Sequence, residues 1–153
     1  MQSVSVSLAL RGFFAVLVAS MLVSLGLRNA QAETEGRAAG GEPYVSGGVG
    51  LEERETLSQR RQEYSLWIAT AVKKSGNYLA DAQVRITDSA GKLVLDTRLD
   101  GPWLLVGLQP GRYTATVSFG KQTLRKTTAL GAGDHRQLMF HFDRAADDVS
   151  SGM

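Results

Sequence analysis

The sequence predicts an all-β domain: a two-layered β-sandwich of seven short strands, preceded by one short helix. Apolar and polar residues alternate in several short segments, the pattern of strands with one buried side. Turn residues such as Pro110-Gly111 separate these segments every 8–12 residues or so, roughly the spacing found in sandwiches. The chain contains no cysteine, so packing and sheet hydrogen bonds must hold the fold together without disulfides.

Residues 1–32 have the organisation of a signal peptide. Arg11 precedes an apolar stretch over residues 12–27, and Ala30-Gln31-Ala32 fits the small-x-small pattern of a cleavage site. The alternative is an uncleaved membrane anchor, but the apolar stretch is shorter than the roughly 20 residues that span a bilayer. We therefore expect cleavage after Ala32, a periplasmic or secreted protein, and no stable membrane insertion afterwards.

The charge of the remaining chain excludes one class of partner. The full sequence of 153 residues carries a formal charge of +2. Arg11 and Arg28 both lie in the expected signal peptide, which has no acidic residue, so the rest of the chain is formally neutral. A neutral chain without a basic stripe argues against a nucleic-acid partner.

The chain after the signal peptide begins with two weakly apolar segments. Residues 33–50 are rich in glycine, and we expect a flexible leader there because ordering glycine is entropically costly. Residues 51–63 contain good helix formers, with acidic residues first and basic residues later, which suits the helix dipole. Only Leu51 and Leu57 are apolar in this short helix, so its buried stripe is thin.

The sandwich itself is expected over residues 64–143, followed by a disordered tail over 144–153. The tail is poor in large apolar residues, whereas the preceding segment alternates repeatedly. The clearest case is the strand after Pro110-Gly111, in which Tyr113, Ala115 and Val117 share one side. The strands are expected near 64–72, 82–87, 93–95, 103–106, 113–119, 122–128 and 137–142.

The order of the turn motifs resembles the carboxypeptidase regulatory-like domain, which belongs to the prealbumin-like (transthyretin-like) sandwiches. The resemblance extends over about residues 64–142 and rests on Ala80–Asp88, Gly91-Lys92, Asp100-Gly101 and Leu108–Tyr113. It implies a seven-stranded prealbumin-like or immunoglobulin-like β-sandwich in a bacterial exported protein. These motifs are turn and core residues, so they imply a fold and not an activity.

Few residues suggest a ligand site. Trp103 and Tyr78 follow or lie in loops, where aromatic rings can stack on a sugar; filling of the core is the alternative for Trp103. His135, Met139 and His141 share one strand parity and are weak candidates for a metal site. Residues four apart on a strand are about 13 Å apart, too far for one ion to join His135 to the others. We expect no catalytic residues and no cofactor.

The sequence therefore favours an exported, non-enzymatic binding or assembly module that acts on a protein partner in the cell envelope. Edge strands or the helix over 51–63 would contact that partner. The alternative is a carbohydrate-binding module that uses Trp103 and Tyr78. A small hydrolase built on Asp134-His135 ranks last, because the chain has no Gly-x-Ser-x-Gly motif.

Overall fold

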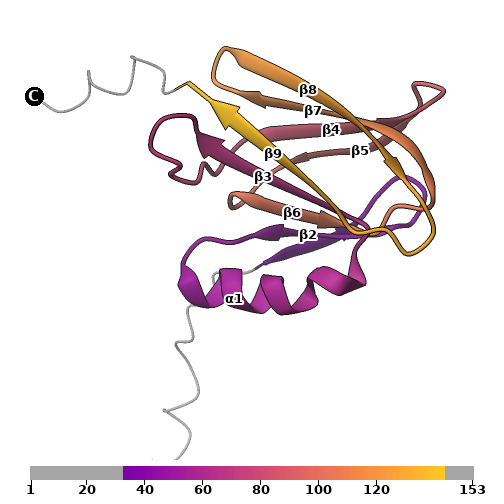
Figure 1. Ribbon diagram of the computed structural model, residues 1–153, viewed down its shortest axis with the longest axis horizontal. Coiled ribbons are helices and arrows are strands. Elements are labelled where there is room, and N and C mark those ends of the chain that lie inside the picture. Colours follow the sequence, from indigo (N-terminus) through magenta and orange to yellow (C-terminus); the bar gives the residue numbers. More distant parts are fainter. Residues whose placement is uncertain (1–32, 144–153) are drawn as a thin grey trace, which may run out of the picture. The chain divides into compact units, whose positions relative to one another are not determined.

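The structure, a computed structural model, describes residues 33–143. These residues form nine strands in two sheets, one helix and one 3₁₀ turn (Figure 1). The expected signal peptide and tail lie outside them. The elements are β1 (Thr34–Arg37), β2 (Pro43–Gly47), α1 (Leu51–Arg60), η1 (Arg61–Glu63), β3 (Leu66–Val72), β4 (Gln83–Asp88), β5 (Leu93–Arg98), β6 (Trp103–Val106), β7 (Gly111–Phe119), β8 (Gln122–Leu130) and β9 (Arg136–Phe142).

The predicted sandwich-like arrangement is confirmed: the chain is mostly β, with two sheets and one short helix. The first sheet has the strand order β1-β2-β6-β3-β9 and the second β5-β4-β7-β8. All neighbouring strands are antiparallel except β3 and β9, which run parallel. The described residues contain nine strands, not the seven expected, because the sequence pattern missed β1 and β2.

Thr34–Arg37 and Pro43–Gly47 are strands joined by a turn, so the expectation of a flexible leader over residues 33–50 is wrong for this part. Pairing with β6 gives β2 a ladder of hydrogen bonds that offsets the entropy of its glycine. Val45 is fully buried on one side of β2, and β1 pairs with the other edge of β2. Arg60 of α1 holds the start of β1 through ion pairs to Glu33 (3.0 Å) and Glu35 (2.8 Å).

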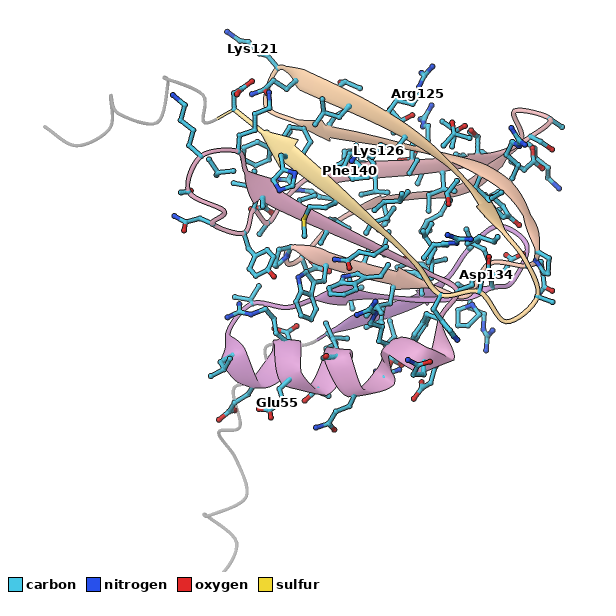
Figure 2. All side chains as sticks on the ribbon, in the orientation of Figure 1. Glu55, Lys121, Arg125, Lys126, Asp134 and Phe140 are labelled. Atoms are coloured by element: carbon cyan, nitrogen blue, oxygen red, sulfur yellow. The ribbon has the colours of Figure 1, made fainter. Side chains whose placement is uncertain are left out.

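The main core lies between the two sheets. The strand after Pro110-Gly111 confirms its predicted pattern, because Ala115 and Val117 are buried while Thr116 between them faces outward. On the open side of the sandwich, Lys126 of β8 donates a hydrogen bond of 2.7 Å to the Met139 carbonyl of β9, beside the Phe140 ring (Figure 2). The fully buried side chains of the core include Leu66, Ile68, Val84, Ile86, Leu104, Val106, Phe140 and Phe142.

The helix predicted over residues 51–63 is confirmed as α1 followed by η1. Acidic residues occupy its first turn and Arg60 its last, as the dipole favours. Leu57 is its one buried residue, whereas Leu51 is 73% exposed. Glu55 lies on the side of α1 that faces away from the sheets (Figure 2). Leu57 is therefore the buried apolar contact between the helix and the first sheet, and the ion pairs of Arg60 add a polar one.

Two buried polar side chains join loops to the first sheet. The Ser46 hydroxyl accepts a hydrogen bond of 3.0 Å from the Asp100 N–H, in the loop between β5 and β6. The Thr70 hydroxyl lies within hydrogen-bond distance of the carbonyls of Leu79 (2.5 Å) and Pro102 (3.2 Å). The Ser46 contact holds the loop before β6 against the end of β2, and the Thr70 contacts hold this loop and the loop after β3 against β3. Among residues 33–143, no helix has the length and apolar character to cross a bilayer.

Candidate functional site

Trp103 does not form the sugar-stacking platform expected with Tyr78. Its side chain is only 7% exposed, and it contacts Trp67 and Tyr78 edge-to-face, with ring centroids 4.8 and 5.9 Å away. Tyr78 is 44% exposed. A sugar ring needs an accessible aromatic face, so the expectation for Trp103 is wrong and the pair offers no platform.

Trp103 is buried because α1 covers the outward side of β6. It belongs to a second apolar cluster with Val45, Leu57 and Leu105, between the helix and the first sheet. The indole N–H groups of Trp103 and Trp67 are both buried without a hydrogen-bond partner among the described residues. The sequence could not show this arrangement, because it depends on where a distant helix packs.

The three metal candidates are not brought together. Met139 and His141 lie on the outward side of β9, two residues apart. His135 precedes the strand, and its Nδ1 lies 2.8 Å from the carbonyl oxygen of Tyr64. In the part of the chain that the structure describes, no group of three or more histidines and carboxylates is placed to hold a metal ion.

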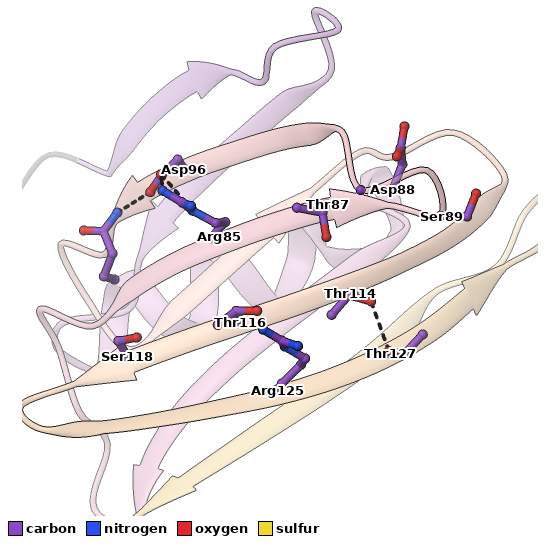
Figure 3. A pocket seen from close by; sticks show the side chains of 12 residues that line it. Arg85, Thr87, Asp88, Ser89, Asp96, Thr114, Thr116, Ser118, Arg125 and Thr127 are labelled. Carbon is purple, nitrogen blue, oxygen red and sulfur yellow. Dashed lines mark hydrogen bonds and ion pairs between the residues drawn. The ribbon is translucent and has the colours of Figure 1, made fainter.

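A different surface is hollowed: the outward side of the second sheet, which no described helix or strand covers (Figure 3). The hollow has a volume of about 780 Å³ and is open to solvent. We call this surface the polar face, because almost all its side chains end in hydroxyl, amide, guanidinium or carboxylate groups. It is lined by Gln83, Arg85, Thr87, Asp88, Ser89, Gly91, Asp96, Thr114, Thr116, Ser118, Arg125 and Thr127.

Strand register places two arginines in one row across the polar face. Arg85 of β4 lies opposite Asp96 of β5 on one side and Thr116 of β7 on the other. Thr116 in turn lies opposite Arg125 of β8. The row Asp96–Arg85–Thr116–Arg125 therefore crosses all four strands. Figure 3 shows Arg85 turned toward Asp96 and Arg125 reaching over β7 toward Thr116.

Asp96 holds Arg85 and Gln83 in place. Its Oδ2 accepts hydrogen bonds from Arg85 Nη2 (2.6 Å) and Nε (3.1 Å), and its Oδ1 accepts one from Gln83 Nε2 (2.6 Å). The hydrogen bonds from Arg85 and then from Gln83 lower the pKa of Asp96 from its ordinary value. Asp96 therefore stays ionised at neutral pH and uses both of its oxygens within the sheet.

The pKa of Asp96 gives a direct test of this pair. A carbon-detected NMR titration should place the pKa of Asp96 below its ordinary value, and Arg85→Met should raise it again, because the largest cause of the shift is removed. A lowered pKa means that the pair stabilises the fold at neutral pH and loses this effect as the pH falls through that pKa. Asp134 serves as the control, because a backbone hydrogen bond from Gly131 is the main cause of its lowered pKa. An unchanged Asp96 pKa in the variant would contradict the assignment.

Hydroxyl groups around the row are partly engaged with one another. The hydroxyls of Thr114 and Thr127 lie 3.1 Å apart, and those of Ser118 and Thr123 lie 2.9 Å apart. Thr116 sits between these two pairs, and its hydroxyl has no hydrogen-bond partner among the described residues. The face thus combines fixed polar groups with hydroxyls, that of Thr116 among them, that make no such bond within the described residues.

Sequence reasoning did not find this site. The alternation of Gln83, Arg85 and Thr87 with apolar residues indicated only a half-buried strand with a solvated side. Which residues of four strands stand next to one another depends on register, and no local signal encodes it. The one available hint was that threonines and arginines, and no large apolar residues, occupy the outward positions of β7 and β8.

Comparison with known proteins does not name a family: no protein-family model matches the chain, and no curated protein matches it. What defines the molecule is its own geometry, a two-sheet β-sandwich with one helix-covered face and one open polar face.

Proposed function

We propose that this chain is a non-enzymatic binding module of the cell envelope that holds a partner protein on its polar face. The observation that carries the proposal is the hollow of about 780 Å³ on the second sheet, lined from all four strands. Its side chains present hydrogen-bonding groups, several of which are fixed by their neighbours. Pre-organised polar groups lose little freedom on binding, which favours recognition of a polar surface.

The helix is a weaker candidate for the contact surface. Its one buried residue, Leu57, anchors it to the first sheet, and its outward side is mainly charged and polar. Leu51 is its single large exposed apolar residue. An isolated exposed leucine is common on protein surfaces and needs no partner to explain it.

Two further parts of the proposal concern compartment and fold type. The features of residues 1–32 support export and cleavage after Ala32. The two-sheet arrangement and the Pro110-Gly111 turn into β7 support a prealbumin-like sandwich related to the carboxypeptidase regulatory-like domain.

Site-specific photo-cross-linking in the cell envelope tests the function. A benzophenone amino acid replaces Ser89, which is exposed at the rim of the hollow, or Gln59, which is exposed on α1. We expect the full chain to form one discrete protein adduct from position 89 in the envelope fraction and none from position 59. An adduct from position 59 alone, or no adduct from position 89, would overturn the proposal.

A further inference from the structure

The charged side chains of the polar face differ in how many partners they have, although the lining as a whole is formally neutral. Asp96 uses both oxygens on Arg85 and Gln83. Asp88 accepts two backbone hydrogen bonds of 2.9 Å within its own turn, from the N–H groups of Ala90 and Lys92. Asp96 is thus occupied by its neighbours on the face, and Asp88 directs its Oδ1 into its own turn.

Arg125 is the cation of the lining that no carboxylate of the described residues neutralises. Its side chain is exposed, and among residues 33–143 no carboxylate pairs with it. It stands one strand away from Thr116, whose hydroxyl is also free. A guanidinium offers two parallel N–H donors, a geometry that matches the two oxygens of a carboxylate. The Thr116 hydroxyl is placed to donate a further hydrogen bond to the same anion.

We propose that Arg125 and Thr116 bind a side-chain carboxylate in an acidic segment of the partner protein. This inference rests on the proposed function and names the chemistry of the partner. Acidic polysaccharides also carry carboxylates, but sugar rings are commonly bound by stacking on aromatic side chains. None of the residues that line the hollow is aromatic. Its hydroxyls and the Gln83 amide suit the N–H and C=O groups of a peptide.

Arg85 has a supporting role in this arrangement. It lies about 10 Å from Arg125, at two strand spacings, with Thr116 between them. Its Nη1 makes no hydrogen bond among the described residues, since only Nε and Nη2 bind Asp96. A second acidic residue of the partner can therefore contact Arg85 Nη1 while the first occupies Arg125. The site thus recognises spaced acidic residues instead of a lone anion.

Binding of a fluorescent octaglutamate peptide to the purified protein tests the inference. We expect saturable binding by fluorescence anisotropy, weakened by salt because the contact is exposed. Arg125→Gln should weaken binding by about tenfold or more, the effect of one charge-assisted hydrogen bond. Thr116→Val should weaken it by a smaller factor. Arg112→Gln is the matched control, because it removes the same charge from β7 outside the hollow, and it should change binding less than about twofold.

The outcomes separate this inference from the proposed function. Octaglutamate binding that Arg125→Gln and Arg112→Gln weaken equally, or no octaglutamate binding, would overturn the inference. So would binding of polygalacturonate or inorganic phosphate in place of the peptide. If one of these results is found and position 89 still forms its adduct, the proposed binding module is retained and only the acidic character of its partner is rejected. Thermal unfolding of each variant confirms that it is folded.

Discussion

Replacing Gly101 by alanine is expected to destabilise the protein by about 3 kcal/mol, the upper end of the effect of overpacking. A Cβ at this position would overlap the carbonyl group of Gly47, and a backbone group cannot swing away as a flexible side chain can. Gly101 belongs to the buried loop that Ser46 fixes against the end of β2. Relief of the overlap must therefore separate this loop from β2.

Urea denaturation followed by tryptophan fluorescence measures this effect, because Trp103 lies two residues after the substitution. Gly131→Ala is the control. The atoms nearest to its added Cβ would be those of the Asp134 carboxylate, at 3.5 Å and beyond, an ordinary contact distance. We expect a change within about 0.5 kcal/mol for the control. If Gly101→Ala and Gly131→Ala were equally stable, the close packing of Gly101 against β2 would be contradicted.

Leu57→Ala is expected to cost about 2–5 kcal/mol of unfolding free energy, the range for truncation of a buried leucine. Leu57 is fully buried among Val45, Tyr64, Trp103 and Leu105, and no other residue of α1 is buried. The variant should also expose Trp103, because the helix covers it. A red shift of tryptophan emission before global unfolding would report this local loosening.

The same helix provides a matched control. Leu51→Ala removes the same side chain from a position that is 73% exposed, and we expect a change within about 0.5 kcal/mol. Both variants keep good helix formers, so the difference between them measures docking and not helix propensity. A loss of similar size in both variants would contradict the docking of α1 through Leu57.

The sequence predicted those elements whose signal is local. The strand after Pro110-Gly111 carries its alternation within a single segment, and the helix over 51–63 carries its charge pattern within ten residues or so. By contrast, β1 contains only Thr34-Glu35-Gly36-Arg37, with no apolar residue at all. β1 is a strand because it pairs with β2 and because Arg60 forms an ion pair with Glu35. Both contacts are tertiary and leave no local signal in the sequence.

The site depended on such tertiary information even more. Trp103 follows a loop in the sequence, but it is buried because α1 packs over it, and it belongs to an apolar cluster. The row that contains Arg85 and Arg125 exists because four strands pair in one register. In the sequence these residues stand far apart, each in a segment that indicated an ordinary solvated strand side.

The parallel pairing of β9 with β3 also has a consequence for how the chain matures. Strand β9 completes the first sheet, yet it lies 70 residues after its neighbour. Phe140 and Phe142, two of the largest side chains of the interior, arrive with it. Synthesis starts at the amino terminus. The core between the sheets therefore stays incomplete until β9, the last described strand, has been made. Long-range closure of this kind makes folding slow, because the entropy of closing a long loop is lost before the contacts that compensate for it form.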